Sequence, residues 1–323
     1  MRALLLLLVL VGACSPREWP AGPVTGSPRL MPDAVVAADD ARLPLASWPP
    51  EGAPRAVVLA LHGLGDHSGL FLEEAAPLLT AGGVALYAYD QRGFGAAPGR
   101  GLWAGTRTLT DDARDTLALL RARHPGLPLV LLGESMGGAI ALLAGEGAAD
   151  RVILLAPALW NRDAMGRGLS GVLWLAAHTI PTVGFENSAP GYVASDNTAA
   201  LRRLSRDPLT LRTTRVEVLW GVTNLMDQAV GTLPACCSVP TLVLLGAKDS
   251  IVPQGPVRRA LRSVPDGAAL TVARYQDGYH LLLRDSIRGV VMADLLDWIV
   301  DPAAPLPSGA DAAGRAWLAG PQN

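Results

Sequence analysis

Short apolar runs recur along the chain, separated by segments of helical periodicity. Five continuous runs lie at residues 56–61, 84–89, 129–132, 152–155 and 241–245. A run without polar alternation is typical of a strand that is buried on both faces. Helical patterns are found at residues 70–79, 110–123, 136–147, 254–263 and 287–300, with a further strand at 270–275. The alternation predicts an α/β fold, in which helices cover both faces of a mostly parallel central sheet.

The edges of this pattern predict the domain organisation. Residues 34–38 and 43–48 flank Asp39-Asp40-Ala41 and predict a hairpin before the parallel strands. The alternation stops between residues 158 and 238, where apolar segments at 169–177 and 216–230 predict a helical cap. The core is therefore expected at residues 33–157 and 239–301. Residues 302–323 are rich in Ala, Pro and Gly and are expected to form a loose tail.

The N-terminus carries the features of an export signal. Arg2 precedes an apolar run at residues 3–13, which is too short to span a bilayer and is typical of a signal-peptide core. The run ends in Val11-Gly12-Ala13-Cys14, which resembles a bacterial lipobox and implies lipid attachment at Cys14. The alternative is an ordinary signal peptide, and the protein would then be secreted.

Composition after the signal supports an anchored protein of the bacterial cell envelope. Residues 14–32 are rich in Pro, Gly and Ser and predict a flexible linker. Ser15 is not the aspartate that often retains lipoproteins in the inner membrane, so the resemblance favours the outer membrane.

Charge and cysteine content exclude several classes of protein. The chain has 323 residues, 50% of them hydrophobic and 17% charged, with a net charge of −2. This composition argues against intrinsic disorder and against a nucleic-acid partner. Cys236 and Cys237 are adjacent, and neighbouring Cα atoms lie closer than most disulfides allow, so two unbonded cysteines are expected. Neither metal-ligand spacing nor a dinucleotide motif is present, so no metal and no cofactor are expected.

A candidate nucleophile follows the third apolar run. Residues 129–132 lead into Gly133-Glu134-Ser135-Met136-Gly137, and a predicted helix comes next. This is the G-x-S-x-G nucleophile elbow in its strand–turn–helix setting, and it identifies Ser135 as the nucleophile. Glycines on both sides allow the helix and strand to approach closely.

A serine nucleophile requires a base and an acid, and the later strands supply both. His280 follows the last predicted strand, and Asp249 follows the strand at 241–245. The chain order Ser135, Asp249, His280 is the order in which nucleophile, acid and base occur in proteins with this nucleophile elbow. Asp277 is the rival acid, but it shares the loop of His280 and would orient that histidine less well.

Two backbone N–H groups are expected to bind the oxyanion of the tetrahedral intermediate. One belongs to Met136, the residue after the nucleophile. The other is assigned to Leu64, in the Gly-containing loop after the strand at 56–61. His62 begins that loop and is expected to brace it by hydrogen bonding, and Asp90 and Arg92 are expected to pair and hold their own loop.

Together these motifs resemble the α/β-hydrolases of the monoacylglycerol lipase and lysophospholipase group, also classed with serine aminopeptidase-like hydrolases. The resemblance covers roughly residues 34–300. It is carried by His62-Gly63-Leu64-Gly65-Asp66-His67-Ser68, Tyr89-Asp90-Gln91-Arg92-Gly93-Phe94-Gly95, Gly133-Glu134-Ser135-Met136-Gly137-Gly138, Asp207-Pro208-Leu209, Gly246-Ala247-Lys248-Asp249 and Tyr279-His280. Phe94 and Glu134 stand where the group more often has histidine.

The resemblance implies an esterase that acts on a monoacylglycerol or lysophospholipid. Trp174 and Trp220 of the cap are expected to line the acyl-chain pocket, although they could only pack the cap on the core. A peptidase or another small-ester hydrolase on the same fold is the alternative. A membrane-anchored binding protein without catalysis is the alternative from a different class.

Overall fold

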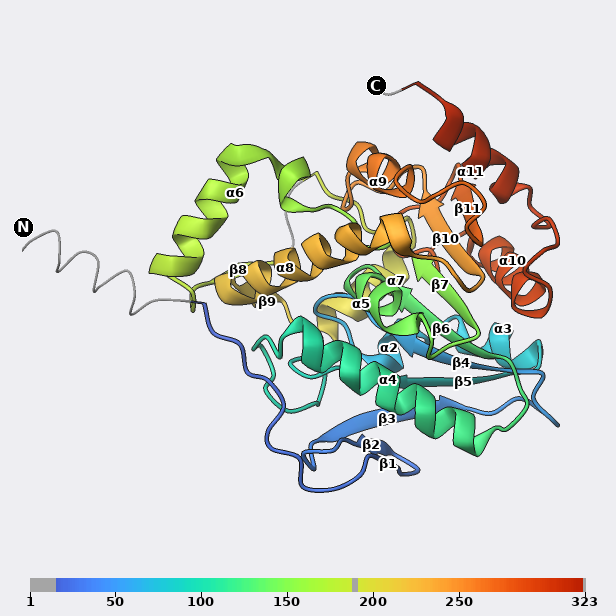
Figure 1. The fold of residues 1–323 in the computed structure, drawn as a ribbon, viewed down its shortest axis with the longest axis horizontal. Helices are drawn as coiled ribbons and strands as arrows, with labels where there is room; N and C mark the ends of the chain where they lie inside the picture. The colour runs from blue at the N-terminus through green and yellow to red at the C-terminus, as the bar shows by residue number, and fades with distance from the viewer. Residues whose placement is uncertain (1–15, 188–190, 322–323) are drawn as a thin grey trace, which may run out of the picture.

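A nine-stranded sheet forms the centre of the molecule in the computed structural model, which describes residues 16–187 and 191–321 (Figure 1). Its strand order is β1-β2-β3-β5-β4-β6-β7-β10-β11. The strands are β1 (Arg29–Leu30), β2 (Ala34–Val36), β3 (Arg42–Trp48), β4 (Ala56–Leu61), β5 (Val84–Tyr89), β6 (Leu129–Glu134), β7 (Arg151–Leu155), β10 (Thr241–Gly246) and β11 (Leu270–Tyr275). The strands from β5 to β11 in this order pair in parallel, whereas β1, β2 and β3 are antiparallel. The predicted α/β fold is confirmed.

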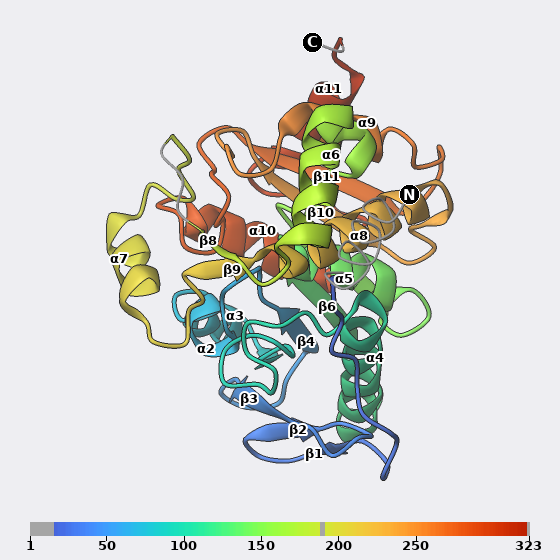
Figure 2. The same ribbon diagram turned by 90° about the vertical axis from the view of Figure 1, so that its left-hand side faces the viewer.

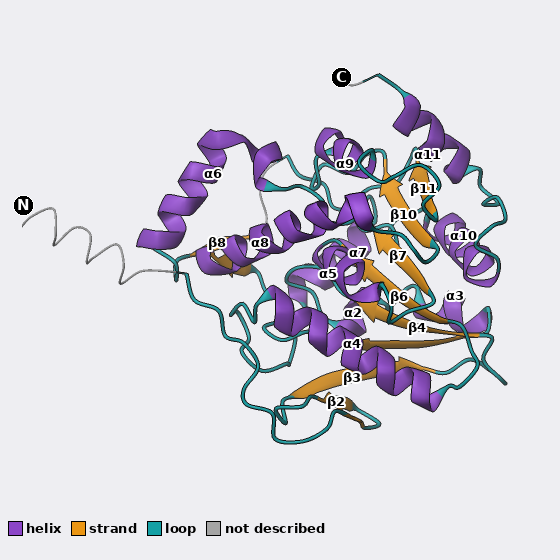
Figure 3. Ribbon diagram, in the orientation of Figure 1, coloured by secondary structure: helices purple, strands orange, loops and turns teal. Residues whose placement is uncertain are grey.

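Helices cover both faces of the sheet (Figure 3). One face packs against α4 (Thr106–Arg123), α5 (Met136–Gly145), α8 (Val216–Thr232) and α9 (Gln254–Leu261). The other packs against α2 (Ser68–Phe71), α3 (Ala76–Ala81) and α10 (Arg288–Val300). Side chains of β4 alternate between the two layers, Val57 and Leu59 in the first and Val58 in the second. The apolar runs are continuous because each strand supplies side chains to two separate cores.

Two predicted helices differ from the structure for local reasons. Residues 70–79 split into α2 and α3, and Pro77 lies at the start of α3, where a proline without an N–H is tolerated. The helix predicted at residues 110–123 begins four residues earlier, at Thr106, where α4 follows Gly105. Gly105 has a φ of 88°, a backbone conformation that favours glycine.

The insertion between β7 and β10 forms the cap. It contains α6 (Arg162–Thr179), α7 (Thr198–Arg206), α8, the short helix η1 (Leu233–Ala235) and an antiparallel pair, β8 (Gly184–Glu186) with β9 (Thr213–Arg215). Figure 2 shows α7 and the strand pair on one side of the molecule, with α6 crossing above α8. The strand pair was not predicted, since three-residue strands carry almost no periodicity.

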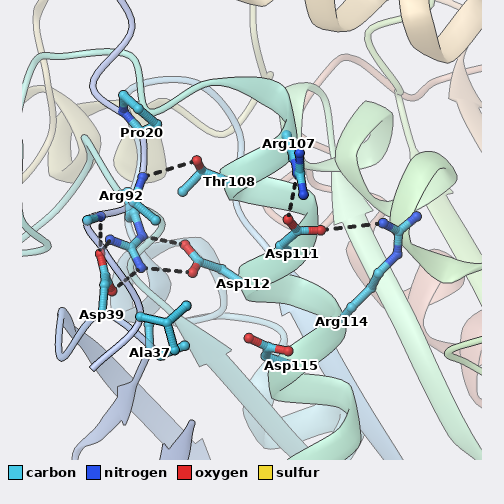
Figure 4. Close-up of a pocket in the computed structure, with 14 residues that line it drawn as sticks. Pro20, Ala37, Asp39, Arg92, Arg107, Thr108, Asp111, Asp112, Arg114 and Asp115 are labelled. Carbon is cyan, nitrogen blue, oxygen red and sulfur yellow. Dashed lines mark hydrogen bonds and ion pairs between the residues drawn. The ribbon is translucent and has the colours of Figure 1, made fainter. Parts of the chain in front are cut away.

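The N-terminal segment is not the flexible linker that its composition predicted. Trp19 donates its backbone N–H to the carbonyl of Trp103 (2.7 Å), Gly22 donates to Asp39 (2.8 Å), and β1 pairs with β2. Arg92 holds the same region together, because it forms ion pairs with Asp39 and with Asp112 of α4 (Figure 4). The segment is therefore bound to the surface of the core by backbone hydrogen bonds, which do not depend on apolar periodicity.

The expected pairing of Asp90 with Arg92 is accordingly wrong. Arg92 is bound to Asp39 and Asp112, whereas Asp90 accepts hydrogen bonds from Ser68 and from the backbone of Ala96. Asp90 still stabilises its loop, but through these neutral donors.

The described part of the C-terminal tail, residues 302–321, is also ordered, contrary to expectation. Residues 302–323 contain α11 (Ala310–Ala319), which packs against the edge strand β11. Gly314 permits close contact, since a Cβ placed on it would lie 1.9 Å from the Val272 carbonyl oxygen. Arg258 and Arg262 of the α9 region donate to carbonyls of Trp317 and Leu318. The small residues that suggested a loose tail allow this packing instead.

The cysteines also differ from expectation. The structure joins Cys236 and Cys237 in a disulfide, whereas two unbonded cysteines were predicted. Cys237 has a φ of 69°, and this turn brings the two side chains together. Cys14 lies outside the described residues. Within the part of the chain that the structure describes, no helix combines the length and apolar character needed to cross a bilayer.

Candidate active site

Ser135 lies on a sharp turn between β6 and α5. Its φ of 55° and ψ of −114° are strained for a residue with a side chain. The turn is compact, since a Cβ on Gly133 would lie 2.1 Å from the Gly137 carbonyl oxygen and a Cβ on Gly137 would lie 2.3 Å from that of Leu61. The two glycines therefore permit the close contact between strand and helix that lifts the serine hydroxyl above the sheet.

Asp249 and His280 meet at the neighbouring strand ends. Asp249 Oδ2 lies 2.8 Å from His280 Nδ1, and both side chains are buried. The other oxygen, Oδ1, accepts the backbone N–H groups of Ile251 (2.8 Å) and Val252 (3.0 Å). The carboxylate is thereby fixed in the orientation that holds the imidazole through Nδ1.

Burial and Asp249 act in opposite directions on the pKa of His280. Burial lowers this pKa, because a charged imidazole loses its hydration. The hydrogen bond and the charge of Asp249 raise it, assisted by Glu134 and Asp285, and the pKa is raised overall. Asp249 therefore stabilises the imidazolium that a proton-accepting histidine becomes.

The rival acid, Asp277, does not contact His280 in the structure. Its carboxylate lies 2.7 Å from the Nζ of Lys248, at the surface. The geometry therefore places Asp249, and not Asp277, as the partner of the histidine.

The oxyanion loop after β4 is braced by hydrogen bonds. His62 Nδ1 donates to the Gly63 carbonyl (2.9 Å), and its Nε2 accepts the backbone N–H of Gln91 (3.1 Å). Burial lowers the pKa of His62, which agrees with a neutral imidazole that both donates and accepts. Leu64 lies in this loop and lines the same cavity as Ser135, and Met136 is the first residue of α5, where N–H groups have no acceptor within the helix.

One segment of the cap supports both catalytic loops. The Ala194 carbonyl accepts the N–H groups of His280 (3.1 Å) and Leu281 (2.9 Å). Val193 donates to the Ser250 hydroxyl, next to Asp249 (2.9 Å). These contacts were not predicted, because the segment carries no motif and acts through its backbone.

Asp285 is a further buried acid that sequence reasoning missed. It accepts hydrogen bonds from the Ser195 hydroxyl (2.5 Å) and the backbone N–H of Tyr279 (2.6 Å). Burial raises its pKa to about 6, although both hydrogen bonds oppose this. It joins the cap to the loop that carries His280.

Ser135 and His280 open into a cavity of about 410 Å³ between the core and the cap. Leu64 and Glu134 lie beside Ser135. The apolar part of the lining consists of Leu64, Phe185, Ala194, Leu204, Leu211, Leu219, Ile251 and Leu281. The polar side chains are Asp66, Glu134, Ser135, Glu186, Asn187, Thr210, Thr214 and His280. Among the described lining residues there is no lysine or arginine.

Trp174 and Trp220 do not line this cavity, contrary to expectation. His178 stacks on Trp174, with ring centroids 4.5 Å apart, and meets the edge of Trp220 at 5.5 Å. Arg162 lies over Trp220. The two tryptophans therefore join α6 to α8 within the cap, which differs both from the predicted pocket lining and from the alternative that they pack the cap on the core.

The fold and this site define an α/β-hydrolase. The serine nucleophile elbow, the buried Asp249–His280 pair and the loop after β4 occupy the positions that this fold provides for them. The chain belongs to the serine aminopeptidase S33 family, whose model matches residues 52–287. It is accordingly a hydrolase.

Several characterised proteins are similar to the chain over most of their length. A monoacylglycerol lipase of Mycolicibacterium smegmatis is 28% identical over 262 residues, which cover 78% of this chain and 91% of the lipase. A human monoglyceride lipase is also 28% identical, over 86% of this chain and 95% of the lipase.

Solved structures share the fold. A monoacylglycerol lipase of Paleococcus ferrophilus matches with a TM-score of 0.65 and 23% identity, over 80% of this chain and 98% of the other. A soluble variant of monoglyceride lipase from Saccharomyces cerevisiae matches with a TM-score of 0.68 and 18% identity, over 88% of this chain and 97% of the other.

Proposed function

We propose that the protein is a serine ester hydrolase that cleaves single-chain lipids through an acyl-enzyme on Ser135. The observation that carries the proposal is the buried Asp249–His280 hydrogen bond at the cavity into which Ser135 opens. The monoacylglycerol and monoglyceride lipases named above support an ester as the bond that is cleaved.

The proposed reaction has two halves. Ser135 Oγ attacks the ester carbonyl while His280 Nε2 accepts its proton, and Asp249 stabilises the resulting imidazolium. The N–H groups of Leu64 and Met136 bind the oxyanion. His280 then protonates the leaving alcohol, and water repeats the cycle on the acyl-enzyme.

The lining of the cavity favours a neutral substrate with one acyl chain. Phe185, Leu204 and Leu219 belong to an apolar wall that suits a hydrocarbon chain. Glu186 is acidic, the charge of Asp66 is already paired with Arg284, and the described lining holds no lysine or arginine to pair with a phosphate. We therefore favour a monoacylglycerol over a lysophospholipid.

The same acidic lining favours one second candidate. A substrate amine would find the Glu186 carboxylate there, so an aminopeptidase activity is the alternative on this site.

A substrate panel distinguishes these candidates. The purified protein is assayed on monoacylglycerols of graded chain length, lysophosphatidylcholine, p-nitrophenyl esters and aminoacyl p-nitroanilides, with Ser135→Ala as control. We expect kcat/KM to be highest for a monoacylglycerol and at least tenfold lower for the lysophospholipid. Faster cleavage of the anilides would favour the peptidase. A binding protein would be favoured if no substrate is turned over and a fluorophosphonate does not label Ser135.

We extend the proposal to the location of the enzyme. The lipobox-like sequence at Cys14 supports a lipid anchor in the bacterial cell envelope, with the outer membrane favoured. Mass spectrometry of the mature N-terminus tests this. A diacylated or triacylated Cys14 is expected, and an unmodified N-terminus beyond Cys14 would indicate a secreted hydrolase.

A further inference from the structure

A cluster of three charged side chains lies buried beside the candidate active site. Asp66 belongs to the oxyanion loop, Glu134 is the last residue of β6, and Arg284 follows His280 by four residues. Their relative exposures are 5%, 1% and 3%. The cluster therefore joins the three segments that carry the oxyanion donor, the nucleophile and the base.

Arg284 connects two of these segments directly. Its Nη2 donates to Asp66 Oδ2 in a buried ion pair. The other oxygen of Asp66 accepts the backbone N–H of His67 (2.8 Å), and the Asp66 N–H donates to the Gly63 carbonyl (3.3 Å). The position of the loop around Leu64 thus depends on the guanidinium of Arg284.

The remaining polar atoms of the cluster are complementary. Within the described residues, Nε and Nη1 of Arg284 and Oε2 of Glu134 are buried and have no hydrogen-bond partner. Buried donors and acceptors are costly when unpaired, and a guanidinium presents its N–H groups in a fork that fits a carboxylate. The Glu134 carboxyl also lies against the oxyanion loop, with Oε1 3.7 Å from a Cβ built on Gly63.

We propose that Glu134 and Arg284 are positioning residues, which together hold the nucleophile elbow and the oxyanion loop at a fixed distance from His280. Arg284 binds Asp66 through one N–H group and attracts the Glu134 carboxylate with the others. The proposal rests on the serine hydrolase function given above. Glu134 stands where the group that the sequence resembles more often has histidine.

The charges around Glu134 and His280 predict how the cluster affects pH dependence. Burial raises the pKa of Glu134 to about 7, while Arg284 lowers it and Asp66 raises it. Ionised Glu134 in turn raises the pKa of His280, as do Asp249 and Asp285. Removal of the Glu134 charge should therefore lower the pKa of the histidine.

Two variants test the proposal, with hydrolysis of p-nitrophenyl butyrate as the assay. Glu134→Gln keeps the shape and removes the charge. We expect the acid limb of its kcat/KM profile to move to lower pH by about 0.3–0.5 unit. Arg284→Met should lower kcat by about 10- to 100-fold at nearly constant KM, because a displaced oxyanion donor costs up to about 10³ in kcat.

The double variant tests the coupling. We expect Glu134→Gln to change kcat less than twofold when Arg284 is already Met, and by less than it does in the wild type, since the attraction between the two charges is then already absent. Arg288→Met is the matched control, because Arg288 pairs with Glu74 at the surface (3.0 Å) and should leave kcat unchanged. If Arg284→Met does not fold, Arg284→Lys is used in its place, because lysine keeps the charge but lacks the forked N–H groups of the guanidinium.

The outcomes separate this inference from the proposed function. If the wild-type enzyme is active but the pH profile of Glu134→Gln is unshifted, the inference is overturned and the proposed function stands. Additive effects of the two substitutions in the double variant would have the same consequence. A wild-type protein that neither hydrolyses the ester nor reacts with a fluorophosphonate at Ser135 would overturn both.

Discussion

Replacement of Asp249 by Asn should leave the shape of the site intact and reverse one hydrogen bond. Asp249 Oδ1 is bound by two backbone N–H groups, and Oδ2 lies 2.8 Å from His280 Nδ1. In the variant, the backbone N–H groups of Ile251 and Val252 require the amide oxygen to occupy the position of Asp249 Oδ1. The amide NH₂ must therefore point toward the histidine.

The size of the effect follows from the tautomer of His280. Facing an NH₂ donor, Nδ1 must accept, so the imidazole carries its proton on Nε2 and cannot take the proton of Ser135. The corresponding change in a serine protease triad lowers kcat by about 10⁴. At 1.36 kcal/mol for each factor of ten, this corresponds to about 5.4 kcal/mol of transition-state stabilisation. We expect the same order of loss in kcat and little change in KM.

The pH profile gives a second measure of the same change. The base must be neutral to act, so kcat/KM of the wild type should fall as the pH decreases through the pKa of His280. Burial lowers that pKa, but Asp249, Glu134 and Asp285 together more than offset this, so the acid limb should lie above the ordinary pKa of a histidine. Without the charge of Asp249, the acid limb of the residual activity should move to lower pH.

Steady-state hydrolysis of p-nitrophenyl butyrate from pH 5 to 9 measures both effects. Asp277→Asn is the matched control, because Asp277 pairs with Lys248 and should be dispensable. A loss below tenfold in Asp249→Asn, or an equal loss in Asp277→Asn, would refute the assignment of the acid.

Three further predictions concern the nucleophile, the elbow and the tail. Ser135→Ala should abolish turnover and fluorophosphonate labelling without a change in Tm, and activity within tenfold of the wild type would exclude Ser135 as the nucleophile. Gly137→Ala should lower kcat at least 100-fold, because its Cβ would lie 2.3 Å from the Leu61 carbonyl oxygen; full activity would show that the elbow can shift. Deletion of residues 302–323 should lower Tm, measured by differential scanning calorimetry, by at least about 5 °C, because it exposes β11 to solvent. An unchanged Tm would show that the tail does not stabilise the fold.

The sheet was predictable because its signal lies within each strand. Continuous apolar runs predicted β4, β5, β6, β7 and β10 to within two residues at either end. The elbow at Ser135 was predictable for a related reason, since its steric demands are satisfied by glycines at fixed spacing. The chain order then indicated Asp249 and His280, and the structure brings these two together.

The lining of the cavity was not predictable, because it depends on how distant segments pack. Phe185 lies on a three-residue strand, and Leu219 lies on a helix that contributes to both cap and core. Trp174 and Trp220 lie in the two apolar segments of the cap, but an apolar segment does not determine the direction in which a side chain points. The ordered N-terminal segment and α11 escaped prediction because polar and small residues contact the core through backbone groups.

The bound N-terminal segment changes what an anchor at Cys14 would do to the enzyme. The backbone of Trp19 donates a hydrogen bond to Trp103, so five peptide steps separate Cys14 from the folded surface. At about 3.3–3.6 Å per residue these span at most about 18 Å, in place of the flexible coil of residues 14–32 that the composition predicted. Such a short connection would limit rotation of the domain and present one side of it to the membrane. Orientation, more than distance, would then decide which lipids reach the mouth of the cavity.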